Sequence, residues 1–147
     1  MMTARLRFPL LGLGIVSLFC GVWAGLLRFG WNLPQGRANL IELHGPLMVF
    51  GFLGTVISLE RAVALRRPWG YLAPAGTLAG TALLFAGLRQ GIGELVLLLA
   101  GCVLAGLFVV ILRAHATAPT ATLLLGALLW VVGDALWLHG DPLVQVV

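Results

Sequence analysis

A histidine within an apolar stretch is the residue best suited to bind a cofactor. His44 stands in "IELHGPLMVF", two residues after Glu42 and four before Met48. A neutral imidazole is the commonest metal ligand in proteins, and its second ring nitrogen usually needs an acceptor that orients the ring. Glu42, Glu94 or Asp134 could supply that acceptor. The pattern admits a metal ligand at His44, whereas a lone histidine at a helix end is more often a residue that makes only an interfacial hydrogen bond.

A second histidine, His139, could complete the metal centre. His44 and His139 could form a bis-imidazole pair on haem iron, or they could hold copper together with Met48 or a carboxylate. We therefore expect haem first and copper second as the cofactor. The residues predicted to bind it are His44, Met48, Asp134 and His139, with His44 and His139 on the metal and Glu42, Glu94, Trp130 and Trp137 around them.

Asp134 is an acid within an apolar run, and Trp130 and Trp137 share its face at helical spacing. An acid inside a membrane costs a few kcal/mol on insertion scales and normally faces the bundle interior with a partner. The two indole rings and the carboxylate could flank a flat cofactor. Alternatively, an indole N–H bonds the carboxylate within a packed bundle.

The composition places the chain in a membrane. Of its 147 residues, 61% are hydrophobic and only 10% are charged, against roughly 45–50% and about 25% in soluble domains. No Ser/His/Asp set, glycine-rich phosphate loop or helical zinc-protease motif is present, so hydrolase and kinase activities are not indicated. The basic residues, all arginine, are scattered rather than arranged in a stripe, which argues against nucleic acid.

The apolar residues fall into runs at about 8–27, 40–65, 69–88, 91–112 and 118–138, each bounded by Gly, Pro or Arg. About 20 apolar residues make one span. The sequence therefore predicts an all-α, polytopic transmembrane bundle of five spans in a single domain, 1–147. The apolar ending "GDPLVQVV" admits a fragment, or one part of a larger bundle.

The arginines predict the orientation of this bundle. The arginines on the side of the N-terminus are Arg5, Arg7, Arg61, Arg66, Arg67 and Arg113, and those on the other side are Arg28, Arg37 and Arg89. Because the first group is the larger, the positive-inside rule favours N-in/C-out. The same topology brings the ionisable residues Glu42, His44, Glu94, Asp134, His139 and Asp141 to the outer end. Glu60, at the inner end, is expected to pair with Arg61, Arg113 or a helix terminus.

The second run carries small or polar residues on one helical face. They are His44, Met48, Gly51, Thr55 and Ser58, spaced by four, three, four and three. Small residues let helix backbones approach each other in lipid, so we expect a helix-packing seam here. Pro46 lacks an N–H, which predicts a distinctive backbone beside His44, either a loosened helix or its first turn.

The stretch "HGPLMVFGF", His44 to Phe52, resembles the haem-bearing second helix of haem–copper oxidase catalytic subunits. It is similar also to the NnrS family of multispanning haem and copper proteins linked to nitric oxide tolerance. The longer string "HGPLMVFGFLGTVISLERAVAL" looks like bacterial membrane proteins of that broad group. The resemblance implies an axial haem ligand at His44. The chain has three histidines altogether, too few for the second haem and the copper of an oxidase.

We expect an integral membrane protein of the bacterial cytoplasmic (inner) membrane that binds a metal cofactor and serves electron transport or small-gas handling. A proton, cation or small-solute transporter that uses Glu42, Glu94 and Asp134 is one alternative. A non-catalytic assembly subunit is another. The expected partners are the lipid bilayer and a second copy or a larger membrane complex. An enzymatic activity is neither indicated nor excluded.

Overall fold

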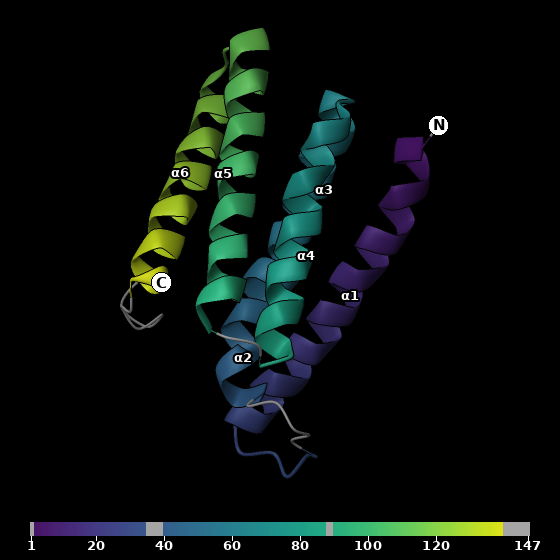
Figure 1. Cartoon of the computed structure of the whole chain (residues 1–147), viewed down its shortest axis with the longest axis vertical. Helices are drawn as coiled ribbons and strands as arrows, with labels where there is room; N and C mark the ends of the chain where they lie inside the picture. The colour runs from purple at the N-terminus through teal and green to yellow at the C-terminus, as the bar shows by residue number, and fades with distance from the viewer. Residues whose placement is uncertain (1, 35–39, 88–89, 140–147) are drawn as a thin grey trace.

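The computed structural model describes residues 2–34, 40–87 and 90–139, and every regular element in these ranges is a helix (Figure 1). In chain order the elements are α1 (Met2–Arg28), α2 (Leu40–Pro46), the π-helix η1 (Leu47–Gly54), α3 (Thr55–Leu65), the 3-10 helix η2 (Pro68–Tyr71), α4 (Leu72–Phe85), α5 (Gln90–Ala114) and α6 (Ala118–Leu138). The predicted all-α class is confirmed. Asp141, Arg37 and Arg89 lie outside the described residues, as does the side chain of Arg5.

Helices long and apolar enough to cross a membrane account for most of the described chain. Four segments qualify, Leu6–Arg28, Leu40–Leu65, Gly91–Ala114 and Ala118–Leu138, so the prediction of a transmembrane helical bundle is confirmed at that level. The second of them combines α2, η1 and α3 into one helical run without a break. Of the two remaining helices, η2 has 4 residues and α4 has 14. The count of five spans and the N-in orientation stay predictions.

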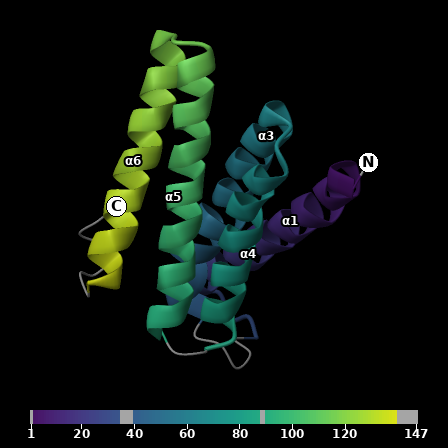
Figure 2. The same ribbon diagram turned by 45° about the horizontal axis from the view of Figure 1, so that its top comes forward.

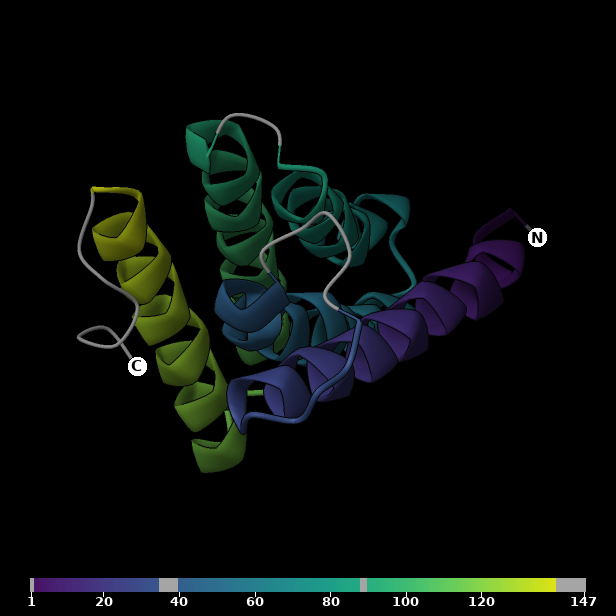
Figure 3. The same ribbon diagram turned by 90° about the horizontal axis from the view of Figure 1, so that it is seen from below.

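The helices run up and down in a single bundle (Figure 1). α5 packs against both α4 and α6, and α5 and α6 stay side by side when the view is turned, whereas α1 diverges from them toward the N-terminus (Figure 2). Seen from below, α2 lies between α1 and α5 (Figure 3). The run from α2 to α3 is therefore the central element, with one face toward α1 and another toward α4, α5 and α6.

A seam of small residues joins α1 to this central run. A Cβ atom added to Gly14 would lie 3.4 Å from Cγ2 of Thr55, and one added to Gly21 would lie 2.7 Å from Sδ of Met48. Between these levels, Ser17 Oγ donates a hydrogen bond of 3.1 Å to the carbonyl oxygen of Leu47. This confirms the predicted packing face of the second span.

The backbone after Pro46 is wider than an α-helix. Pro46 closes α2 and Leu47–Gly54 forms a π-helix. Since proline has no N–H, the bond that position 46 would make to the carbonyl of Glu42 in an α-helix is missing. The predicted distinctive backbone is confirmed, but the helix begins six residues before the proline and its π form was not anticipated. Single-turn π segments occur often at functional sites.

Hydroxyl groups fill the interior beside η1. Thr55 and Thr77 share a hydrogen bond of 3.1 Å between their Oγ1 atoms, and Thr81 Oγ1 donates to the carbonyl oxygen of Thr77 at 2.7 Å. Ser58 Oγ donates to the carbonyl oxygen of Thr55 at 3.2 Å. All four side chains are buried, so each hydroxyl is satisfied locally, as the absence of water in lipid requires.

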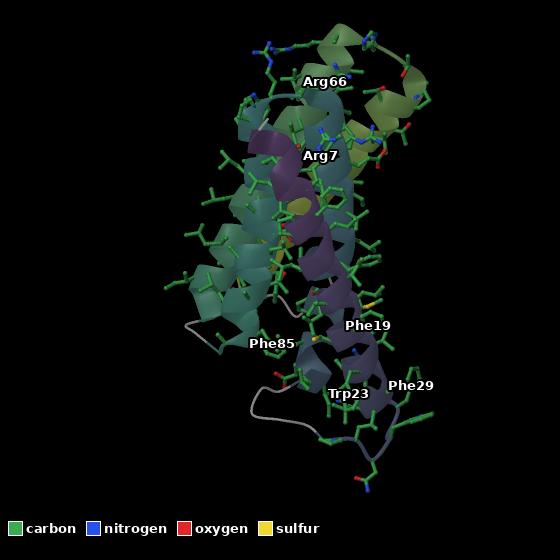
Figure 4. The ribbon with its side chains drawn as sticks, turned by 90° about the vertical axis from the view of Figure 1, so that its right-hand side faces the viewer. Arg7, Phe19, Trp23, Phe29, Arg66 and Phe85 are labelled. Atoms are coloured by element: carbon green, nitrogen blue, oxygen red, sulfur yellow. The ribbon has the colours of Figure 1, made fainter. Side chains whose placement is uncertain are left out.

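The labelled arginines, Arg7 and Arg66, and the labelled aromatic residues Trp23, Phe29 and Phe85 lie toward opposite ends of the bundle (Figure 4). At the arginine end Arg61 Nη2 lies 2.6 Å from Oε1 of Glu60, which confirms Arg61 as the partner of that acid.

Candidate functional site

His44 is held in one defined orientation against α1. Its Nδ1 atom lies 2.8 Å from the carbonyl oxygen of Gly21. A carbonyl oxygen only accepts hydrogen bonds, so Nδ1 carries the proton and the lone pair is left on Nε2. A metal-binding histidine typically donates its other ring N–H in this way, which fixes the tautomer and strengthens the ligand. In His44 this contact occupies Nδ1 and leaves Nε2 as the ring nitrogen that can accept.

The surface that receives this ring is glycine. A Cβ atom added to Gly25 would lie 2.9 Å from Cε1, 3.1 Å from Nδ1 and 3.7 Å from Nε2 of His44. Any side chain at position 25 would therefore press on the imidazole. Met48, one turn after His44, approaches the same helix at Gly21. The structure thus brings together two of the predicted cofactor-binding residues, His44 and Met48, on the face toward α1.

Asp134 belongs to a different group, between α5 and α6. Its side chain is 3% exposed, and a Cβ atom added to Gly101 of α5 would lie 3.3 Å from its Oδ2. Trp130, one turn earlier, lies beside the same glycine, with its Cδ1 atom 4.0 Å from the added Cβ. Within the described ranges Oδ2 has no hydrogen-bond partner. An unpaired polar atom at such burial is uncommon and calls for a functional explanation.

Two tryptophans join this second group to the π-helix. The ring of Phe50 is stacked on that of Trp137, with 5.7 Å between centroids and 6° between planes. It also meets Trp130 edge to face at 5.7 Å and 64°, and Trp130 reaches Gly54 as well. The shared face of Trp130, Asp134 and Trp137 is as predicted. Because Phe50 packs on both indoles, the packed-bundle alternative describes this group better than rings that flank a cofactor.

The contacts therefore divide the predicted residues into two groups. His44 and Met48 face α1, whereas Asp134 and its two tryptophans face α5 and η1. The orienting acceptor of His44 is the Gly21 carbonyl, in place of the carboxylates named from the sequence; the spacing of Gly14, Ser17, Gly21 and Gly25 was the signal that could have identified α1 as the partner helix.

The remaining predicted residues are more peripheral. Glu42 and His139 are exposed and Glu94 is half-buried; Glu42 lies in α2 with His44, Glu94 near the start of α5 and His139 directly after α6. In the described part of the chain, no three His, Cys, Asp or Glu side chains are close enough together to hold a metal ion. The described residues thus place one histidine, His44, against α1 and one buried carboxyl group, that of Asp134, between α5 and α6.

Comparison with known proteins identifies a family. The model of a family described as "Domain of unknown function (DUF8744)" matches residues 7–147, and the chain therefore belongs to that family. No curated protein and no solved structure matches the chain.

Proposed function

We propose that this DUF8744 protein binds haem in the membrane through Nε2 of His44 and serves redox transfer or small-gas handling. The single observation that supports the proposal is the contact between His44 Nδ1 and the Gly21 carbonyl oxygen, 2.8 Å long. It leaves on Nε2 the lone pair that an axial ligand needs. The resemblance of "HGPLMVFGF" to haem-bearing helices points to the same residue.

The set of donor atoms favours haem over copper. Haem brings four nitrogen ligands of its own and needs a single protein side chain on one face. Copper needs two or more soft or imidazole ligands from the protein. His44 has Met48 one turn away on the same face, but no cluster of three His, Cys, Asp or Glu side chains surrounds it within the described ranges. When bound, haem supplies reversible one-electron chemistry and an iron that binds small gases.

The residues of the chain would hold and tune such a group. The Gly21 carbonyl withdraws the Nδ1 proton partly from the ring, which raises the electron density at Nε2 and strengthens the ligand. Gly25 lets α1 approach without a side chain beside the imidazole. Pro46, two residues after His44, has no N–H, and the π-helix follows it from Leu47. These features position the ligand; they require no movement of the bundle.

The proposal includes the finer topology. α4 and η2 together cover residues 68–85, which at about 1.5 Å and 2.0 Å of rise per residue reach about 29 Å, close to the roughly 30 Å of a bilayer core. We therefore retain five spans with the N-terminus inside, in a bacterial inner membrane. His44 then lies near the outer surface, where an electron or a gas could arrive from the periplasmic side. A second copy or a larger complex could supply a further ligand.

An absorption spectrum tests this proposal. The full chain is expressed with ample haem, purified in detergent and compared with His44→Ala and His115→Ala. His115 is an exposed histidine beyond the opposite end of α5, so its variant is the matched control. We expect a Soret band in the wild type and in His115→Ala and at least a tenfold weaker one in His44→Ala.

The Soret bands are compared only between variants that are folded. Circular dichroism and gel filtration show whether His44→Ala remains a helical, monodisperse protein. A colourless wild type under these conditions would overturn the proposal, and so would a Soret band of equal strength in a folded His44→Ala.

A further inference from the structure

A second polar centre, distinct from His44, lies between α5 and α6. Asp134 is 3% exposed and sits on a helix whose residues Ala118–Leu138 are long and apolar enough to cross a membrane. Its Oδ2 atom faces α5 at Gly101 and has no hydrogen-bond partner in the described ranges. An acid inside a membrane is, as a rule, a functional residue.

Within residues 2–34, 40–87 and 90–139, no basic side chain forms an ion pair with this carboxyl group. On α5 the ionisable side chains are Glu94, Cys102 and Arg113, of which Cys102 is exposed and Arg113 lies twelve residues beyond Gly101. Glu94 lies two turns before Gly101 and carries the same sign as an ionised Asp134. The facing segment of η1, "LMVFGFLG", has no ionisable side chain. His139, after the end of α6, is exposed.

The recorded neighbours of Asp134 carry no charge. The indole of Trp130 lies beside the same glycine of α5, and its ring packs on Phe50 and approaches Gly54. Val131 lies beside that glycine as well. None of these side chains balances a full negative charge in a medium of low dielectric constant.

We infer that Asp134 is a proton-binding site inside the membrane, with its carboxyl group held in the neutral, protonated form between α5 and α6. We assign the proton to Oδ2, the oxygen that is buried without a hydrogen-bond partner in the described ranges. The ligand is a proton rather than a metal cation, since a cation needs several oxygen ligands and no cluster of three acidic, His or Cys side chains lies in the described part of the chain.

This inference is independent of haem at His44, because the two groups face different helices. It gives the bundle an acid that can take up or release a proton within the low-dielectric layer. Ionisation would place an unbalanced charge at the contact between α5 and α6. The protonation state of Asp134 and the packing of these two helices are therefore linked.

Infrared spectroscopy tests the protonation state directly. The full chain is made with aspartate labelled with ¹³C at the side-chain carboxyl carbon and placed in lipid vesicles at pH 7 without haem. The chain has one other aspartate, Asp141, so Asp141→Asn is the matched control for Asp134→Asn. We expect a C=O band of a protonated carboxyl group that shifts with ¹³C and in heavy water, remains in Asp141→Asn and disappears in Asp134→Asn.

Both variants are isosteric, and circular dichroism verifies that they fold. A wild-type spectrum with only ionised carboxylate bands at pH 7 would overturn the inference. A protonated band that survives in Asp134→Asn but is lost in Asp141→Asn would overturn it as well. Neither result depends on whether the protein binds haem.

Discussion

The imidazole of His44 rests directly on Gly25 of α1, where an added Cβ atom would lie 2.9 Å from its Cε1 atom. The hydrogen bond from Nδ1 to the Gly21 carbonyl lies one turn earlier on the same helix. His44 of the central run is therefore held by two backbone positions of α1, Gly21 and Gly25. The geometry of the proposed ligand depends on how closely these two helices approach.

Gly25→Ala is therefore expected to displace His44. A flat ring bonded to a carbonyl cannot move aside without breaking that bond, and overpacking of this kind typically costs about 1–3 kcal/mol. Haem retained per chain, measured by absorbance after gel filtration, should fall several-fold. Gly12→Ala is the control on the same helix, since nothing lies within 4 Å of its added Cβ; equal retention in the two variants would contradict the predicted displacement.

Gly21→Ala should lower the unfolding free energy less than Gly25→Ala does. The added Cβ would meet Sδ of Met48 at 2.7 Å, but methionine is unbranched and readily adopts another rotamer. We expect a loss of unfolding free energy at the lower end of the about 1–3 kcal/mol typical of overpacking. Unfolding in mixed detergent with increasing SDS measures this. A loss larger than that of Gly25→Ala would show Met48 to be rigidly held.

Ser17→Ala should destabilise the contact between α1 and the π-helix. The variant loses the donor to the Leu47 carbonyl, a bond of 3.1 Å that crosses between helices. Interhelical hydrogen bonds in membranes contribute about 0.6 kcal/mol on average, with values of about 1–2 in model peptides. Unfolding in SDS should show that the unfolding free energy of Ser17→Ala is lower by an amount in that range.

Thr122→Ala is the control for Ser17→Ala. Its hydroxyl donates at 3.1 Å to the carbonyl of Ala118 within the same helix, so no contact between helices is lost. The unfolding free energies of the two variants should differ by the contribution of the interhelical hydrogen bond. Equal effects would mean that the Ser17 bond adds nothing to the association of α1 with η1.

Asp134→Leu should leave the stability unchanged or raise it. The native Oδ2 is buried without a hydrogen-bond partner in the described part of the chain, and an unsatisfied buried polar group costs about 1–3 kcal/mol. Leucine removes that cost and fills a similar volume against Gly101. Thermal unfolding followed by circular dichroism is the measurement; a marked drop in the midpoint would reveal a polar partner that stabilises this carboxyl group in the folded protein.

Much of the fold could be predicted from composition and spacing. Apolar runs bounded by Gly, Pro and Arg gave the helical segments, because lipid leaves the backbone few alternatives to a helix. The spacing of His44, Met48, Gly51 and Thr55 predicted a shared face that the structure confirms. These features depend only on residues close in sequence.

The features that were not predicted depend on the backbone and on helix rotation. The acceptor for His44 is a carbonyl group at Gly21, and a carbonyl leaves no mark in the residue types. Asp134 was expected near His44 because both lie at the same end of the bundle. The rotation of α6 about its own axis turns this acid toward α5, and no single-sequence pattern fixes that rotation. The π-helix likewise follows from missing and shifted backbone bonds after Pro46.

The central claim, that His44 supplies the haem ligand, is tested most directly by titrating haem into the purified, haem-free protein and counting the haem that co-elutes with the chain. The account predicts saturable binding in the wild type, an unchanged stoichiometry in His115→Ala and a large loss of bound haem in a folded His44→Ala. Equal binding by the wild type and His44→Ala, or no saturable binding by the wild type, would contradict it.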